Sequence, residues 1–349
     1  MRFLVCICLL MALGSGHGEE FGLRKLPLPG TGGFVILDYT AYDGRQQKLW
    51  VPAGNLGLTA VIDGKTDRIT MVAGFKTGEV ELRGKKWVMG PSSVSIGNGV
   101  AYVGNRGDSS VCVIDAAALK TLGCHAIAEQ GAGLSAAPDA VVYIRATMEL
   151  WITTGAPPLG VPAANKSILV LDAADVQRLK PKTSVPLEAS AEGYAVDERR
   201  GVFFTNLEER AETVAIDVRK KRILSRWKSG CAEPHGLALD QTRGFLFVAC
   251  DDRVVALDVA HDGKVLGSIQ TGDGVDNIDY SAADTLIYAA ASKAATLTIA
   301  RVADNGALSI VAVVPTVKGT RSVTAGAKGT AYLIDPYGGS ILKVFRKSD

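Results

Sequence analysis

A strand-turn-strand motif that recurs about every 43 residues is the feature that most constrains the fold of this chain. Its clearest copy, YVGNRGDSSVCVID, runs from Tyr102 to Asp115. Four further copies are recognised by an apolar strand that ends in Asp, and two degenerate copies end in Arg301 and Phe345. The strand ends of all copies are Asp63, Asp115, Asp172, Asp217, Asp258, Arg301 and Phe345. A fixed period of this size indicates an architecture built from similar units, here seven.

Each copy contains turn residues at a spacing that predicts four short strands, as the stretch from Gly236 to Ile269 illustrates. Four antiparallel strands per copy are typical of one propeller blade, so the chain is predicted to be all-β, a seven-bladed β-propeller with a WD40-like repeat. The last copy lacks a strand because the chain ends soon after Phe345. We expect residues 21–30 to supply that strand and close the ring. The recurring Asp is interpreted as a cap for the next turn.

The N-terminus has the features of an export signal. Residues 1–18 contain Arg2, an apolar run from Phe3 to Leu13, and a small polar segment. This run is shorter than the ~20 residues that a membrane span needs, and no later stretch is long enough. We therefore predict a signal peptide over 1–18 and one propeller domain over 19–349, monomeric and periplasmic or secreted.

Charge argues against a nucleic-acid partner. The chain has 38 Lys and Arg against 36 Asp and Glu, and the predicted signal peptide holds one of the basic residues. A protein whose affinity depends on the phosphate backbone needs clustered cations. The local basic clusters at 83–86 and 219–222 are interpreted as solvated charge.

Four cysteines remain after removal of the signal peptide, in an oxidising compartment. Cys112 and Cys124 lie on neighbouring strands of one predicted hairpin, and Cys231 and Cys250 lie at the same end of another predicted sheet. Two disulfides, 112 to 124 and 231 to 250, are the economical pairing, although four cysteines allow three connectivities. The alternative is a metal site formed by Cys231, His235 and Cys250, whose spacing matches no recognised zinc pattern. No Cys-x-x-Cys-His motif for covalent haem is present.

The segment from Tyr102 to Asp115 resembles the repeat of the YVTN family of seven-bladed propellers, with Gly104 in place of Thr. The pattern extends over residues 21–345, and 233–240 and 276–279 resemble phrases of secreted YncE-like members. The third and sixth copies depart from it, because they lack the consensus Asn and Asp. The resemblance implies the fold. It implies little about function, because some family members bind DNA, similar propellers are scaffolds for redox partners, and related ones hydrolyse lactones.

A site is expected where each innermost strand begins, because these positions surround the propeller axis. Aligning the copies places Gly32, Ser92, Asp139, Gly193, His235, Asp276 and Arg321 at this position, followed by Gly33, Tyr194 and Asn277 among others. Loops between second and third strands add further polar groups at the same end. The predicted ligand-binding residues at the tunnel mouth are Asp139, Tyr194, His235, Asp276, Asn277, Arg321, Asn105 and Arg106. The alternative is a polar, water-filled axis without a specific ligand. The segment 153–166 is either a rim to this mouth or a spacer.

Three functions are compatible with these features. The first is a non-catalytic scaffold that binds a protein, glycan or small molecule at its loop face, without cofactor or metal. The second is a lactonase-like hydrolase that uses Asp139, His235 and Asp276 around a metal or water. The third, weak single-stranded DNA binding, follows only from the resemblance. No nucleophile elbow, phosphate loop or His-Glu-x-x-His helix is present, so no catalytic residue is assigned and the scaffold is favoured.

Overall fold

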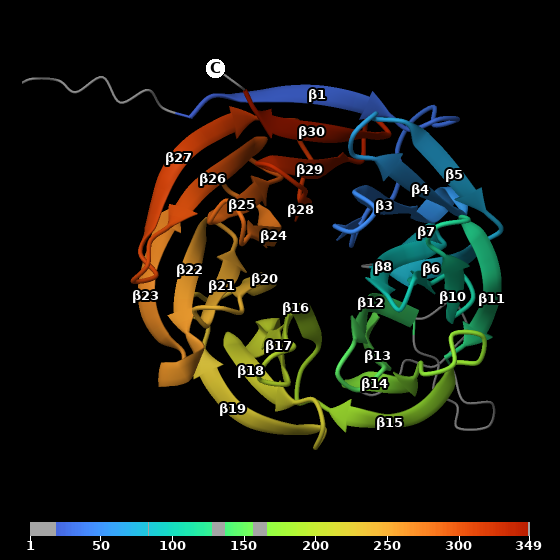
Figure 1. The fold of residues 1–349 in the computed structure, drawn as a ribbon, viewed down its shortest axis with the longest axis horizontal. Coiled ribbons are helices and arrows are strands. Elements are labelled where there is room, and N and C mark those ends of the chain that lie inside the picture. The colour runs from blue at the N-terminus through green and yellow to red at the C-terminus, as the bar shows by residue number, and fades with distance from the viewer. Residues whose placement is uncertain (1–18, 83, 128–136, 156–165, 348–349) are drawn as a thin grey trace, which may run out of the picture.

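The computed structural model of the protein describes residues 19–82, 84–127, 137–155 and 166–347. In this part of the chain, seven antiparallel sheets of four strands follow one another around a ring, which confirms the predicted seven-bladed propeller (Figure 1). In each sheet one strand lies near the axis and another forms the rim. The predicted signal peptide and most of the segment 153–166 fall outside the described residues.

The first four blades each run from an innermost strand outward to the perimeter. Blade 1 consists of β2 (Ala41–Asp43), β3 (Lys48–Ala53), β4 (Leu58–Asp63) and β5 (Ile69–Ala73). Blade 2 consists of β8 (Pro91–Gly97), β9 (Val100–Asn105), β10 (Ser110–Asp115) and β11 (Lys120–Ala126). Blade 3 consists of β12 (Ala137–Ile144), β13 (Glu149–Gly155), β14 (Ser167–Asp172) and β15 (Lys180–Pro186). Blade 4 consists of β16 (Ala191–Asp197), β17 (Val202–Leu207), β18 (Glu212–Asp217) and β19 (Arg222–Lys228).

The other three blades follow the same plan. Blade 5 consists of β20 (Pro234–Asp240), β21 (Phe245–Cys250), β22 (Arg253–Asp258) and β23 (Lys264–Gln270). Blade 6 consists of β24 (Val275–Ser281), β25 (Leu286–Ala291), β26 (Thr296–Val302) and β27 (Leu308–Pro315). Blade 7 consists of β28 (Val323–Ala325), β29 (Thr330–Asp335), β30 (Ser340–Arg346) and β1 (Phe21–Pro27). Three short 3-10 turns complete the described elements: η1 (Gly54–Leu56), η2 (Glu208–Arg210) and η3 (Val259–His261).

The ring is closed by the N-terminal strand. β1 pairs antiparallel with β30, from Phe21 opposite Arg346 to Pro27 opposite Ser340, so the first strand of the chain is the outer strand of the last blade. The prediction that residues 21–30 contain this strand is confirmed. Because β1 covers the outer edge of β30, that strand offers no unpaired backbone groups to another chain.

The hydrophobic core lies between neighbouring blades. The second strands are mainly apolar and mostly buried, as in β9, whereas an outer strand such as β19 alternates between exposed and half-buried residues. Large side chains join the blades: Tyr102 stacks on Tyr143 between blades 2 and 3, and Trp151 stacks on Phe203 between blades 3 and 4. This packing of sheet on sheet holds the innermost strands at fixed positions around the axis.

The recurring Asp has the predicted structural role. The Asp115 carboxylate accepts hydrogen bonds from the backbone N–H groups of Ala117 and Ala118, at 2.9 and 2.8 Å. Asp63 and Asp217 cap the following turns in the same way, and these N–H donors lower the pKa of both carboxyl groups. The repeat Asp therefore belongs to the architecture.

Both predicted disulfides are present. Cys112 and Cys124 lie directly opposite each other on β10 and β11, with Cα atoms 3.9 Å apart. Cys231 and Cys250 are bonded with Cα atoms 6.2 Å apart. The alternative of a metal site at Cys231, His235 and Cys250 is therefore wrong, because both thiols are consumed by the disulfide. Two disulfides are consistent with a periplasmic or extracellular location.

One element was not predicted. A two-stranded hairpin, β6 (Gly78–Leu82) and β7 (Lys85–Met89), is inserted between blades 1 and 2. It carries part of the basic cluster at 83–86 and brings Lys85 and Trp87 toward the axis, where both line a cavity. No helix among the described residues has the length and apolar character needed to cross a membrane.

Candidate functional site

The positions aligned by the repeat coincide with β-bulges. In β12, Asp139 and Ala140 together oppose the single residue Thr153, because the register shifts by one residue there. In β24, Asp276 and Asn277 oppose Ala290 in the same way. Similar shifts occur at the start of β8, β16 and β20. A bulge redirects a side chain that regular pairing would hold above or below the sheet, so these positions are suited to face the axis.

The bulges of β12 and β24 border a central cavity of about 620 Å³. Its lining comes from six of the seven blades or from segments next to them, which places it on the propeller axis. The lining residues are Asp38, Tyr39, Lys85, Trp87, Arg106, Asp139, Glu192, Asp276, Asn277 and Arg321. Five of the eight predicted site residues are among them: Arg106, Asp139, Asp276, Asn277 and Arg321.

The other three predicted residues lie elsewhere. Tyr194 lines a smaller adjoining cavity, and His235 is at the bulge of β20, where its backbone carbonyl accepts a hydrogen bond from Asn206 Nδ2 at 2.5 Å. Asn105 is buried and donates to the carbonyl of Lys76 at 3.0 Å and to Asp108 Oδ1 at 2.8 Å, so it fixes a loop.

Blade 1 also differs from the expected alignment. Equivalent positions in different blades make the same backbone hydrogen bond to the next blade. The Tyr39 N–H donates to the Ser92 carbonyl at 3.2 Å, and the Asn277 N–H donates to the Arg321 carbonyl at 3.0 Å. Asp38 and Tyr39 therefore occupy the position that the alignment assigned to Gly32 and Gly33. The inner strand of blade 1, β2, has only three residues, so the sequence alignment placed the start of this blade six residues too early, in the preceding loop.

Ion pairs organise one side of the cavity. Arg321 bridges two carboxylates, with Nη2 3.2 Å from Asp38 Oδ1 and Nη1 2.9 Å from Asp276 Oδ2. These carboxylates raise the pKa of the Arg321 guanidinium. Burial raises the pKa of Asp38, although Arg321 opposes this effect. The arginine thus neutralises two acidic groups that the fold places near the axis.

A second ion pair lies across the cavity. Arg106 pairs with Asp139, and its Nε donates to the carbonyl of Pro138 at 3.2 Å. The Arg106 side chain is only 8% exposed, and burial lowers its pKa. Asp139 and Asp276 are therefore both engaged by guanidinium groups, which leaves little capacity for the acid-base or metal-binding role that the hydrolase alternative requires.

Glu192 is the one carboxyl group of this lining for which the described residues provide no cation within ion-pair distance. Its Oε1 accepts a hydrogen bond from the Tyr39 hydroxyl at 3.2 Å. Burial and the nearby carboxylates of Asp276 and Asp38 raise the pKa of Glu192 to about 7. Glu192 was not among the predicted site residues. It lies one residue before the aligned Gly193, directly before the bulge that Gly193 and Tyr194 form opposite Thr205.

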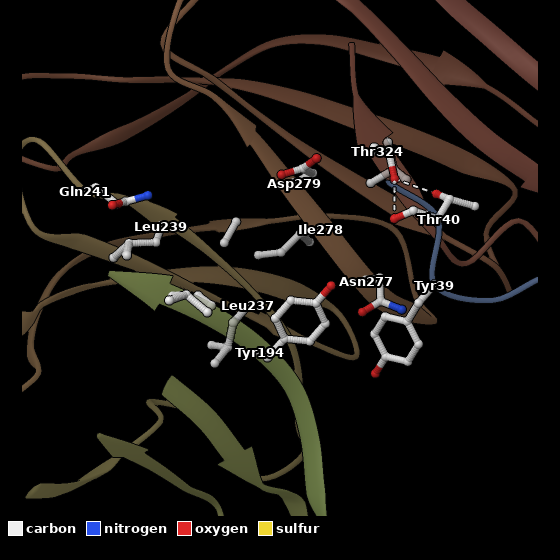
Figure 2. A pocket seen from close by; sticks show the side chains of 14 residues that line it. Tyr39, Thr40, Tyr194, Leu237, Leu239, Gln241, Asn277, Ile278, Asp279 and Thr324 are labelled. Carbon is white, nitrogen blue, oxygen red and sulfur yellow. Dashed lines mark hydrogen bonds between the residues drawn. The ribbon is translucent and has the colours of Figure 1, made fainter. Parts of the chain in front are cut away.

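The smaller cavity continues from the central one, since Tyr39 and Asn277 line both. Its volume is about 240 Å³, and Figure 2 shows Tyr39, Tyr194 and Asn277 at one end and Gln241 at the other. The rings of Tyr39 and Tyr194 are 6.0 Å apart. Burial raises the pKa of Tyr194 to about 12, so this end of the cavity is lined by neutral phenols near pH 7.

A buried acid lies deeper in the smaller cavity. The Asp279 carboxylate accepts hydrogen bonds from the backbone N–H groups of Ala325 at 2.7 Å and Tyr280 at 2.8 Å. Burial raises its pKa to about 6, and the two donors limit the increase. Oδ2 joins blade 6 to blade 7 through Ala325, and Oδ1 accepts from Tyr280 within β24, so we assign Asp279 a structural role.

Exposed aromatic side chains form a cluster next to the central cavity. The Phe34 ring lies 5.9 Å from that of Trp87 and 5.6 Å from that of Tyr337. Trp87 is 36% exposed, Phe34 41% and Tyr337 66%. The three residues, here called the aromatic rim, come from the loop before β2, from β7 and from the turn between β29 and β30. Trp87 also lines the cavity, which makes the rim and the cavity one continuous surface.

The described residues contain no group of three or more His, Cys, Asp or Glu placed to hold a metal ion. Asp139 and Asp276 line the central cavity, and His235 is not among its lining residues.

Comparison with known proteins identifies the fold. No protein-family model matches the chain. No curated protein matches it. Among solved structures, a chain of the crystal structure of the mitotic checkpoint complex is similar, with a TM-score of 0.72, 12% identity, and coverage of 100% of this chain and 98% of that chain. The structure of U3-55K gives a TM-score of 0.66 at 11% identity, covering 92% of this chain and 98% of that one. At such identities the likeness concerns the WD40-type propeller fold alone.

Proposed function

We propose that this chain is an exported, non-catalytic scaffold that binds a protein partner at the face carrying the central cavity and the aromatic rim. The main support for this proposal is the aromatic rim, in which three segments far apart in the sequence present exposed rings beside a polar cavity. Exposed aromatic residues that cluster are typical of protein interfaces, whereas isolated exposed apolar residues need no explanation.

The shape of this face fits the usual anatomy of an interface. Energetically important contacts concentrate where an aromatic or charged side chain enters a pocket, and surrounding residues exclude water from it. Here the rim supplies apolar surface and the cavity supplies a pocket of about 620 Å³. One neighbour in fold is itself a chain of a complex, the mitotic checkpoint complex.

Export and family membership are further parts of the proposal. The N-terminal segment 1–18 has the composition of a signal peptide, and two disulfides join the four remaining cysteines. The motif YVGNRGDSSVCVID supports membership of the YncE-like propellers. A DNA ligand is not favoured, because the cavity lining holds four carboxyl groups against three basic residues.

Selection from a phage-displayed random peptide library tests the proposal without knowledge of the partner. The bait proteins are the wild type, the double variant Trp87→Ala/Tyr337→Ala, and the control Leu224→Ala/Val265→Ala, which removes exposed apolar side chains from β19 and β23 at the perimeter. We expect clones that the wild type and the control enrich and the rim variant does not. Failure to enrich any clone, or equal enrichment by all three baits, would contradict the proposed function.

A further inference from the structure

We propose that the central cavity receives a cationic side chain of the partner, the ammonium of a lysine or the guanidinium of an arginine, and that Glu192 is the group that binds it. This inference rests on the proposed function and specifies the chemistry of the same site. It follows from which charges in the cavity are already paired and which are not.

The acidic groups of the cavity differ in their pairing. Asp38 and Asp276 share Arg321, and Asp139 pairs with Arg106. Among the described residues, the Glu192 carboxyl group has only the neutral hydroxyl of Tyr39 as a hydrogen-bond partner, through Oε1. A partly buried charge without a counter-ion is unfavourable in free energy. An added positive charge is therefore stabilised most strongly beside the Glu192 carboxylate.

The basic groups do not favour an anionic ligand. Both terminal nitrogens of Arg321 already contact carboxylates, and Arg106 is buried in its pair with Asp139. An anion would have to displace one of these carboxylates from its guanidinium. Lys85 is exposed, and no described carboxylate lies within ion-pair distance of it, so water solvates its charge. The arrangement thus selects for a cation.

The approach to Glu192 also suits a long basic side chain. Lysine and arginine bury their aliphatic stems against apolar surface while the charged end keeps polar contacts. Trp87 lines the cavity and belongs to the aromatic rim, so a stem that enters from the rim passes an indole ring. Indole faces attract ammonium and guanidinium groups, which adds to the preference for a cation.

Protonation of Glu192 makes the binding depend on pH. The carboxyl groups of Asp276, Asp38 and Glu208 raise the pKa of Glu192, and the Tyr39 hydroxyl lowers it. The basic residues that line the same cavity are Lys85, Arg106 and Arg321. With a pKa of about 7, the carboxyl group becomes ionised as the pH rises through neutrality. We therefore expect tighter binding of a cation at pH 8 than at pH 6.

Immobilised pentapeptides with a fixed central residue test the inference. The central residue is Lys, Arg, Gln, Met or Glu, and the flanking positions are equimolar mixtures of uncharged residues that include Trp and Leu. We expect the wild-type protein at pH 8 to be retained about tenfold more by Lys- or Arg-centred peptides than by Gln-centred ones. Glu192→Gln should abolish this ratio while keeping retention on the uncharged peptides.

The matched control is Glu233→Gln, which removes an exposed carboxyl group for which the described residues provide no hydrogen-bond or ion-pair partner. It should keep the wild-type preference, and near-ultraviolet circular dichroism should show that both variants are folded. Preference for Glu-centred peptides, equal retention of all charged classes, or an unchanged preference in Glu192→Gln would overturn the inference and leave the proposed function standing. Absence of retention on every peptide would count against the proposed function itself.

Discussion

Replacing Glu192 by Gln is expected to stabilise the folded protein, and to do so more strongly at high pH. The carboxyl group has a pKa of about 7 in the folded protein, against an ordinary value of 4.5. Between these values the folded state holds a proton that the unfolded state has lost. The free energy of unfolding therefore falls as the pH rises through this window, and the loss is complete above pH 7.

The magnitude follows from the size of that difference. Each pKa unit corresponds to about 1.4 kcal/mol, so a rise from 4.5 to about 7 means that the ionised Glu192 costs at most roughly 3–4 kcal/mol at pH 8.5. The neighbouring Asp38 and Asp276 can relax when the charge is present, and solvent reaches part of the side chain, so we expect a gain of roughly 1–3 kcal/mol for Glu192→Gln at pH 8.5. At pH 4.5 the gain should shrink to well below about 1 kcal/mol, because Glu192 of the folded wild type is then protonated.

Urea unfolding followed by tryptophan fluorescence measures this difference at both pH values. The exposed Glu233→Gln serves as the control and should change the free energy of unfolding by less than about 0.5 kcal/mol at either pH. The reasoning would be refuted by a gain of equal size at pH 4.5 and 8.5, or by a loss of stability at pH 8.5. A confirmed gain would mean that the chain keeps an acidic group in its cavity at a cost in stability, as binding sites commonly do.

Three further predictions concern the frame around this cavity. Arg321→Gln should lower the free energy of unfolding by roughly 1–3 kcal/mol at pH 7, because it leaves the carboxylates of Asp38 and Asp276 without their shared cation. The loss should be smaller at pH 4.5, because burial raises the pKa of Asp38 and so favours its neutral form; urea titrations at both pH values check this. Deletion of residues 19–27 should leave the edge of β30 unpaired and produce a concentration-dependent increase in size by light scattering, whereas a chain that stays monodisperse would show that β1 is dispensable. Cys112→Ser/Cys124→Ser should lower the free energy of unfolding by about 2–3 kcal/mol in urea titrations of the oxidised proteins, and an unchanged value would contradict a stabilising role of this disulfide.

The fold was predictable because the repeat distributes its information over the whole chain. Seven strand ends recur at similar spacing, so the loss of the consensus Asp at Arg301 and Phe345 does not obscure the pattern. The disulfides were predictable for a related reason: each pair lies within one blade, where hairpin geometry brings its cysteines together. Ring closure followed from counting strands, because blade 7 lacks one that β1 supplies.

The hairpin β6–β7 shows where a repeat stops being informative. The step from Asp63 to Asp115 is longer than most others, which signals an insertion, but the period alone does not say what the insertion forms. Its two strands pair only with each other, outside the seven sheets. The basic residues 83–86 therefore looked like solvated charge, whereas the hairpin brings Lys85 and Trp87 to the cavity. An insertion of this kind must be placed by tertiary contacts that the repeat does not encode.

Glu192 illustrates the limit more sharply, because it lies inside a strand that the repeat located correctly. Alignment of the copies selected Gly193 as the residue entering this strand, and the structure has a bulge there, with Gly193 and Tyr194 together opposite Thr205. A bulge places two residues opposite one, and the direction of the side chains on either side depends on how the extra residue is accommodated. The sequence indicates where the strand begins but does not say which neighbouring side chain faces the axis. The carboxyl group that carries the proposed specificity thus adjoins the predicted position. Its distinguishing property is that no described residue places a cation within ion-pair distance of it, and this property arises only once Arg321 and Arg106 have formed their ion pairs in the folded protein.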